Sequence, residues 1–154
     1  MKLQGILARL VEHKVRFSVI GGVALVARGV PRSTEDLDIG YARDRDNLRR
    51  LADALAPIRP RLRGVPADLP FVLDEVSLRN GLNFTLDTEE GPIDLLGEVP
   101  GLGSFEGVEQ ASSEMQIANT RVLVLTVDGL ELAKRAAGRP KDLVDLGYLR
   151  ALKG

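Results

Sequence analysis

Two aspartates stand two residues apart in a short, otherwise β-prone segment. In residues 34–39 (TEDLDI), apolar side chains alternate with Asp36 and Asp38. Because strand side chains alternate between faces, these two carboxylates share one face, and Glu35 is predicted to point away from them. Carboxylates this close raise each other's pKa unless a cation lies between them. We therefore predict that Asp36 and Asp38 hold a hard divalent ion, Mg²⁺ or Mn²⁺.

A third carboxylate, Asp94, lies within the apolar segment 92–96 (PIDLL). A carboxylate among residues that favour burial needs a partner, because desolvating it alone costs several kcal/mol. If this segment neighbours the first strand, the three aspartates converge, as a two-metal phosphoryl-transfer site requires. The alternative is that Asp36 and Asp38 face solvent and Asp94 lies at a sheet edge.

Gly21 and Gly22 lie where a strand gives way to a helix. Backbone N–H groups at such a turn can face a phosphate, which approaches closely because glycine has no side chain. A tight turn without a ligand also explains the pair. Gly101, Gly103 and Gly107 miss the G-x-G-x-x-G spacing and are interpreted as loop glycines, and the sequence contains no P-loop motif.

Hydrophobic periodicity predicts alternating helices and strands, with an irregular, proline-rich connection at 57–70. The order predicts an α/β (α+β) domain with a mixed β-sheet and helices packed on it. We expect a single domain over 1–154, with a catalytic core at about 15–100 and a C-terminal strand and helices at about 120–152. The predicted helices are 2–14, 21–28, 44–56, 128–137 (with Asp128 as N-cap) and a last one from Pro140 through Leu152; the strands are 15–20, 37–41, 82–87, 92–96 and 121–126.

The amino-acid composition excludes several kinds of metal site and covalent cross-link. The chain has 154 residues, no cysteine and one histidine, which excludes disulfides, thiolate zinc sites and multi-histidine metal sites. The longest apolar run, 19–27, is too short to cross a membrane, so we expect a cytoplasmic protein without a membrane partner.

Arginines concentrate between Arg43 and Arg63, whereas 80–120 is acidic and lacks Lys and Arg. The basic stretch can meet phosphates or form solvated helix and loop faces.

These residues together resemble the nucleotidyltransferase superfamily with the polymerase-beta-like fold. The resemblance rests on Gly21-Gly22, the segment 32–38 (RSTEDLD) and the isolated Asp94. The segment 132–143 (LAKRAAGRPKDL) is similar to the K-x-x-x-x-R-x-K-D segment of small bacterial members, which include the AbiEii-type toxins of type IV toxin–antitoxin systems. The resemblance spans about 15–150.

The resemblance implies transfer of a nucleoside monophosphate from an NTP, ATP included, to a hydroxyl of RNA (tRNA among them) or protein. It also implies a toxin role with a cognate antitoxin. Asp36 and Asp38 would hold the metal ions, and Asp94 would bind the second metal and help to deprotonate or position the acceptor. Nucleotide binding would fall to Gly21, Gly22, Arg32, Thr34, Lys134 and Lys141.

Other interpretations stay open at this point. Gly22 lacks the hydroxyl of the family's frequent Gly-Ser, so a catalytically inactive nucleotide- or partner-binding module with the same fold is the alternative function. Lys141 and Asp142 can instead form a local pair at the start of the last helix. Asp145 is predicted to lie on the surface, and His13 to be structural or exposed.

Overall fold

The computed structural model describes residues 1–66 and 68–154 and shows a seven-stranded sheet in the order β3-β4-β5-β2-β1-β7-β6. The pairs β2–β5 and β1–β7 are parallel and the remaining neighbours are antiparallel, so the sheet is mixed, as predicted. The strands are β1 (Phe17–Ile20), β2 (Leu37–Tyr41), β3 (Arg61–Leu62), β4 (Asn83–Asp87), β5 (Ile93–Leu96), β6 (Ser112–Ile117) and β7 (Thr120–Leu125).

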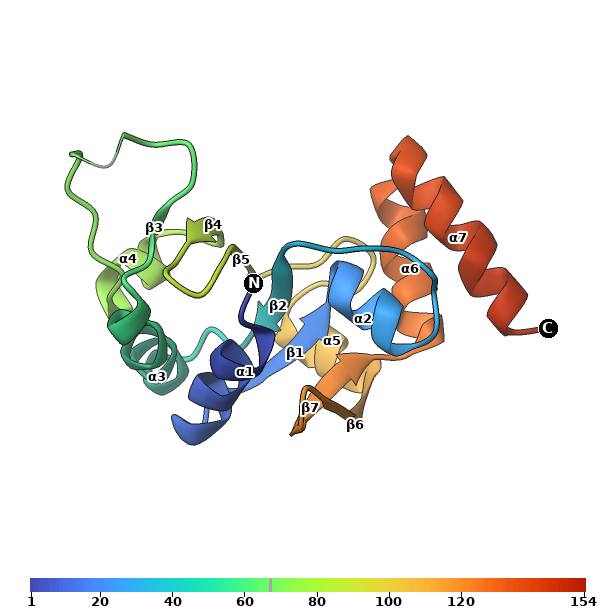
Figure 1. The fold of residues 1–154 in the computed structure, drawn as a ribbon, viewed down its shortest axis with the longest axis horizontal. Coiled ribbons are helices and arrows are strands. Elements are labelled where there is room, and N and C mark those ends of the chain that lie inside the picture. The colour runs from blue at the N-terminus through green and yellow to red at the C-terminus, as the bar shows by residue number, and fades with distance from the viewer. Residues whose placement is uncertain (67) are drawn as a thin grey trace.

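Helices flank this sheet at both ends and over its faces (Figure 1). The α3–α4 pair lies at one end of the molecule and the α6–α7 pair at the other, with α2 and α5 near the central strands. No helix of the described residues is long and apolar enough to cross a membrane. The helices are α1 (Leu3–Glu12), α2 (Gly21–Ala27), α3 (Arg45–Leu55), α4 (Glu75–Asn80), α5 (Phe105–Gln110), α6 (Val127–Ala137) and α7 (Pro140–Leu152), with a 3-10 turn at Ala56–Ile58.

The alternation of side chains along β2 explains why Asp38 is not completely buried. Leu37 and Ile39 of β2 are completely buried, and the intervening Asp38 projects from the other face of the strand, where it is half-buried. This alternation is the one that the sequence predicts. The predicted helices and strands all form, most within about two residues of their expected bounds.

The structure adds four elements that periodicity did not reveal: β3, α4, α5 and β6. They are short or lie toward the sheet edges, so few apolar positions mark them. Gly107 lies within α5, so its interpretation as a loop glycine is wrong.

Two details of the C-terminal helices also differ from expectation. The N-cap of α6 is Thr126, whose Oγ1 accepts a hydrogen bond from Gly129 N at 3.0 Å, and Asp128 lies in the first turn instead. Leucines at helical spacing in α7 would be expected to share one buried face, but only Leu146 and Leu149 are buried, whereas Leu143 and Leu152 are exposed.

One buried amide joins α3 to the two central strands. Asn47 is completely buried, and its Oδ1 accepts a hydrogen bond from Arg16 N at 2.7 Å. Its Nδ2 donates to the carbonyl oxygens of Arg16 and Ala42, at 3.1 and 2.8 Å. Asn47 thus satisfies backbone groups just before β1 and just after β2.

We predict that Asn47→Ala lowers the free energy of unfolding by about 3 kcal/mol, because it leaves buried backbone groups without partners. Asp53→Ala on the exposed side of α3 is the control and should stay within about 0.5 kcal/mol of the wild type. Denaturant unfolding measures both. Equal losses in the two variants would show that the amide does not join these elements.

Candidate active site

The site is built around two carboxylates on neighbouring strands. β2 and β5 are parallel, and their register pairs Asp38 directly with Asp94. Side chains at paired positions project to the same face of a sheet. The Oδ1 atoms of both residues are buried without a hydrogen-bond partner. Burial, together with the charge of the adjacent Asp94, raises the pKa of Asp38 to about 7.

Asp36 precedes β2 and joins this pair through Arg63. The Arg63 guanidinium lies 3.0 Å from Asp94 Oδ1 and 3.8 Å from Asp36 Oδ2. It also donates from Nε to Asp87 Oδ1 at 3.1 Å. The three aspartates predicted from the sequence therefore lie in one cluster, around a cation that the prediction did not include.

The donor chemistry of this cluster suits a divalent cation. Two buried carboxylate oxygens lack hydrogen bonds, and like charges crowded in this way need a compensating cation. As the side chains stand, no three such ligands among the described residues form a ready metal-binding group. A metal held by all three aspartates would therefore require the Asp36–Arg63 contact to open.

Gly21 and Gly22 fit closely against two of the predicted site residues. Gly21 has φ +64°, and a Cβ there would collide with Asp38 Oδ2. A Cβ at Gly22 would lie 2.6 Å from Thr34 Oγ1. Gly21 therefore allows the start of α2 to approach Asp38, and Gly22 allows it to approach Thr34.

A polar cavity of about 460 Å³ opens beside the carboxylates. It includes every residue predicted for metal or nucleotide binding except Gly21, which faces a second cavity. Glu35 also lines the polar cavity; residues 34–36 precede β2, so the strand alternation from which its direction was predicted does not extend to it. The lining residues are Gly22, Arg32, Ser33, Thr34, Glu35, Asp36, Asp38, Asp94, Leu96, Lys134, Arg139 and Lys141.

Cations on the opposite wall are held by two buried aspartates of α7. Lys134 Nζ lies 3.2 Å from both Asp142 Oδ1 and Asp145 Oδ2. Arg32 contacts Asp145 at 2.7 Å, and Arg139 contacts Asp142 at 2.8 Å. Asp145 is 4% exposed, so its predicted surface position is wrong.

Asp142 shows how this network differs from the carboxylate cluster. Burial alone would raise its pKa, but hydrogen bonds from Arg139 and Lys134 outweigh burial and lower the pKa to about 2. Its Oδ2 also accepts from Arg139 N at 3.1 Å, which caps the start of α7. Asp142 therefore pairs with Lys134 and Arg139, not with Lys141 as the local-pair interpretation held. Lys141 is exposed at the cavity and forms no ion pair with the described residues.

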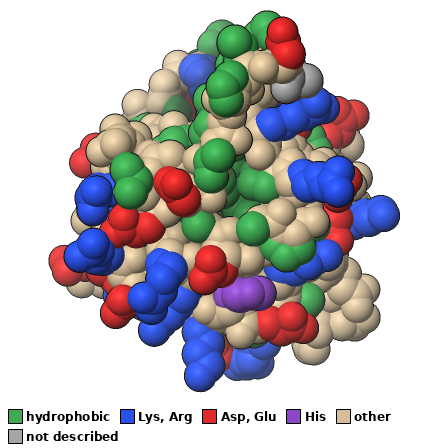
Figure 2. Space-filling model, turned by 90° about the vertical axis from the view of Figure 1, so that its left-hand side faces the viewer, with side chains coloured by type: hydrophobic (Ala, Val, Ile, Leu, Met, Phe, Trp, Pro, Cys, Tyr) green, Lys and Arg blue, Asp and Glu red, His purple; other side chains and the backbone are tan. Residues whose placement is uncertain are grey.

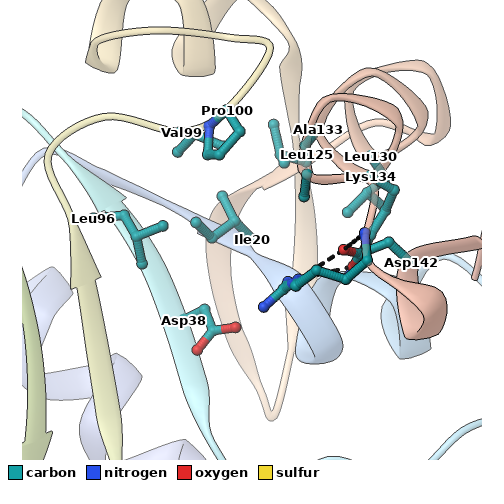
Figure 3. A pocket seen from close by; sticks show the side chains of 13 residues that line it. Ile20, Asp38, Leu96, Val99, Pro100, Leu125, Leu130, Ala133, Lys134 and Asp142 are labelled. Atoms are coloured by element: carbon teal, nitrogen blue, oxygen red, sulfur yellow. Dashed lines mark hydrogen bonds and ion pairs between the residues drawn. The ribbon is translucent and has the colours of Figure 1, made fainter.

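A second, largely apolar cavity of about 400 Å³ adjoins Asp38 (Figure 3). Apolar side chains from the ends of the central strands, the 97–104 loop and α6 surround it, and Asp38 and Lys134 border it. Asp38, Lys134 and Arg139 line both cavities. Its apolar lining, which the sequence did not reveal, consists of Ile20, Leu96, Val99, Pro100, Leu125, Leu130, Ala133 and Ala137.

The arginine-rich stretch does not form a continuous phosphate-binding face. Figure 2 views the end that carries α3 and α4, where Lys and Arg alternate with Asp and Glu around apolar side chains. Arg45 pairs with Glu75, and Arg49 with Asp46. Arg43 donates to the carbonyls of Leu78 and Arg79. In this stretch Arg63 is the arginine that reaches the carboxylate cluster.

The fold has clear counterparts among solved structures. A lincosamide antibiotic adenylyltransferase, LnuA, in its lincomycin-bound form, aligns with a TM-score of 0.64 at 15% identity, over 98% of this chain and 96% of that one. ANT(2")-Ia in complex with adenylyl-2"-tobramycin aligns with a TM-score of 0.61 at 17% identity, over 99% and 87%. A Thermotoga maritima protein described as a nucleotidyltransferase aligns at 0.57 and 16%, over 97% and 88%.

The sequence matches no protein-family model and no curated protein sequence. At this level of identity the structural likeness defines the fold. The chain has the nucleotidyltransferase fold that its sequence motifs predict.

Sequence reasoning missed Arg63 and the apolar cavity. Arg63 lies in a connection rich in proline and glycine, and its register comes from β3, a strand of two residues. The clustering of arginines between 43 and 63 was the available signal, but it does not single out one of them.

We predict that Gly21→Ala destabilises the fold by about 3 kcal/mol, because the new methyl group combines a positive φ with a collision against Asp38. Gly103→Ala is the control: Gly103 has φ +81°, and a Cβ there meets no described atom within 4 Å. It should cost about 1 kcal/mol. Denaturant unfolding measures the free energy of unfolding of both variants. Equal losses would contradict the close approach of Gly21 to Asp38.

We also predict an acid-dependent contribution from Asp142. Its pKa of about 2 lies below the ordinary 3.8, so the folded state favours the carboxylate. This contribution of about 2 kcal/mol is present above pH 4 and is lost as the pH falls through 2. The stability difference between the wild type and Asp142→Asn should shrink over this range, with exposed Asp53→Asn as the control. A difference that is constant with pH would contradict the assignment.

Proposed function

We propose that this protein is a metal-dependent nucleotidyltransferase. An acceptor hydroxyl oxygen would bond to the α-phosphorus of an NTP and lose its proton, the bond from that phosphorus to the bridging oxygen would break, and pyrophosphate would leave. One observation carries the proposal: Asp38 and Asp94 present two buried oxygens without hydrogen bonds at a cavity whose other wall carries lysine and arginine. This combination suits a metal–polyphosphate ligand.

The carboxylates would share the metal-binding work. Asp36 and Asp38 would hold the ions, Mg²⁺ or Mn²⁺, and Asp94 would bind the second ion and position the acceptor hydroxyl. A bound divalent cation would neutralise charge on the triphosphate and the reacting phosphoryl group. Neither buried Oδ1 atom accepts a hydrogen bond, and of the two only that of Asp94 has an ion pair among the described residues, with Arg63.

The opposite wall of the cavity would hold the triphosphate. Lys134 is fixed by two aspartates and is only 12% exposed, so it would act as an immobile positive charge. Lys141 is exposed and would bind phosphate directly. Arg32 and Thr34 would contribute from the segment before β2, and Gly21 and Gly22 would let the phosphates come close to the backbone.

The acceptor that the sequence predicts is a hydroxyl of RNA, tRNA included, or of protein. The segment 132–143 supports this prediction, because it resembles that of AbiEii-type toxins. In this proposal the protein acts in the cytoplasm as the toxin of a pair, uses ATP or another NTP, and is neutralised by a cognate antitoxin.

The apolar cavity favours a second candidate acceptor, a small hydroxylated molecule. Its volume of about 400 Å³ lies within the range of small-molecule sites, and it borders Asp38. Two proteins of the same fold were solved with lincomycin and with an adenylylated tobramycin. This chain would then modify a compound whose apolar part fills the cavity.

We expect the purified protein to transfer label from α-³²P-NTPs in the presence of Mg²⁺. Separate reactions with total RNA, with tRNA, with protein extract and with hydroxylated small molecules distinguish the acceptor classes. Asp36→Ala and Asp38→Asn should lower the rate by roughly 10³-fold or more, because each removes a metal ligand. Asp53→Asn on α3 should keep the wild-type rate.

Two results would contradict the proposal. Failure of the wild type to bind metal–NTP at millimolar concentration would remove its basis. Nucleotide binding without transfer to any acceptor would instead favour the alternative, a catalytically inactive nucleotide- or partner-binding module. Partner binding would then be sought at the acidic region 87–114.

A further inference from the structure

Arg63 contacts three carboxylates that come from three different parts of the chain. Its guanidinium lies 3.1 Å from Asp87 on β4, 3.0 Å from Asp94 on β5 and 3.8 Å from Asp36 before β2. The side chain is about one-third exposed, so solvent and ions can reach it. A positive charge that belongs to the protein thus already lies at the place where the proposed function requires a divalent cation.

β4 fixes the position of Arg63 independently of the carboxylate cluster. Its backbone N–H donates to Thr85 O at 2.9 Å, its Nη2 donates to Leu86 O at 2.8 Å, and its Nε donates to Asp87. The contacts with Asp94 and Asp36 are ion pairs without a hydrogen bond of good geometry. The guanidinium can therefore lose its contact with Asp36 while its anchor on β4 remains.

Lys134 does not form the ion pairs with Asp36 and Asp94 that Arg63 forms. Its Nζ is shared between Asp142 and Asp145, which already supply two negative charges. Arg139 is likewise paired with Asp142. Of the described cations, Arg63 is the one that forms ion pairs with Asp36 and Asp94.

We propose that Arg63 is a built-in counter-ion of the carboxylate cluster, which stabilises the metal-free protein and competes with the divalent cation for Asp36 and Asp94. This inference rests on the proposed function, because it concerns the affinity of the same cluster for metal. Arg63 thereby sets how tightly the cluster binds metal and reduces metal binding when no nucleotide contributes phosphate ligands. It is a positioning residue in this role.

The competing explanation is that Arg63 only joins β3 to β4. The two roles differ in their effect on metal affinity. Loss of a structural link lowers stability but leaves the affinity of the folded site unchanged, whereas loss of a competing charge increases the affinity.

The test is a titration with Mn²⁺, in which electron paramagnetic resonance counts the free ion in the absence of nucleotide. We expect Arg63→Gln to bind Mn²⁺ about tenfold more tightly than the wild type, because a unit charge at contact distance is removed. Arg63→Lys retains the charge and should stay within about threefold of the wild type. Arg61→Gln is the matched control. It makes the same charge change two residues away, at an exposed position that forms no ion pair with the described residues, and it should leave the affinity unchanged.

Thermal unfolding in EDTA and in Mn²⁺ supplies a second readout. Arg63→Gln should be less stable than the wild type in EDTA and should gain more from Mn²⁺, as ligand linkage requires. If Arg63→Gln does not fold, Arg63→Met keeps the apolar part of the side chain and replaces it in both measurements. Asp38→Asn should abolish Mn²⁺ binding, which locates the ion in the cluster.

The outcomes separate the two proposals. Mn²⁺ binding to the wild type with the same affinity in Arg63→Gln, or an equal increase in Arg63→Lys, overturns the counter-ion role and leaves the proposed function intact. Absence of Mn²⁺ binding in every variant overturns the proposed function, and the role of Arg63 with it.

Discussion

Repulsion between two carboxylates at one level of the sheet is the constraint on which the site depends. The register of β2 and β5 places Asp38 beside Asp94, and both are partly buried. An arrangement of this kind is costly unless positive charge lies nearby. The surrounding structure supplies that charge from two sides: Arg63, which follows β3, contacts Asp94, and the charge of Lys134 on α6 acts on Asp38. Gly21 contributes in another way, because its missing side chain leaves room for the Asp38 carboxylate.

Two groups of aspartates carry opposite roles within one small region. Asp142 is completely buried but receives hydrogen bonds from Arg139 and Lys134, and its pKa falls. Asp38 is less buried, yet it lacks such donors and its pKa rises. Asp142 is therefore a structural anion that fixes cations at the cavity wall. Asp38 is an anion whose buried Oδ1 atom has no hydrogen-bond partner. Buried polar groups of this kind are where a bound ligand or a reaction is expected.

The sequence predicted the burial pattern of β2 well, because it depends on local alternation, whereas Asp36 precedes the strand and joins the cluster through Arg63. Convergence with Asp94 was conditional on two strands being neighbours, and the parallel β2–β5 pairing meets that condition. Arg63 could not be found in this way, since a strand of two residues leaves no periodic signal. Asp145 was misplaced for a related reason. Its burial depends on contacts with Arg32 and Lys134, 113 and 11 positions away in the chain, and not on its own helix pattern.

Under the proposed function, the division between the two cavities would allow one backbone to serve different acceptors. Structures with TM-scores of 0.57 to 0.64 share this fold at 15 to 17% identity, so the fold alone does not fix what is bound. The polar cavity holds charged groups that suit phosphate and metal. The apolar cavity is lined by side chains from the 97–104 loop and α6, which can change in size without disturbing the carboxylates. Because Asp38 borders both cavities, a change of acceptor would leave the proposed metal and phosphate site in place.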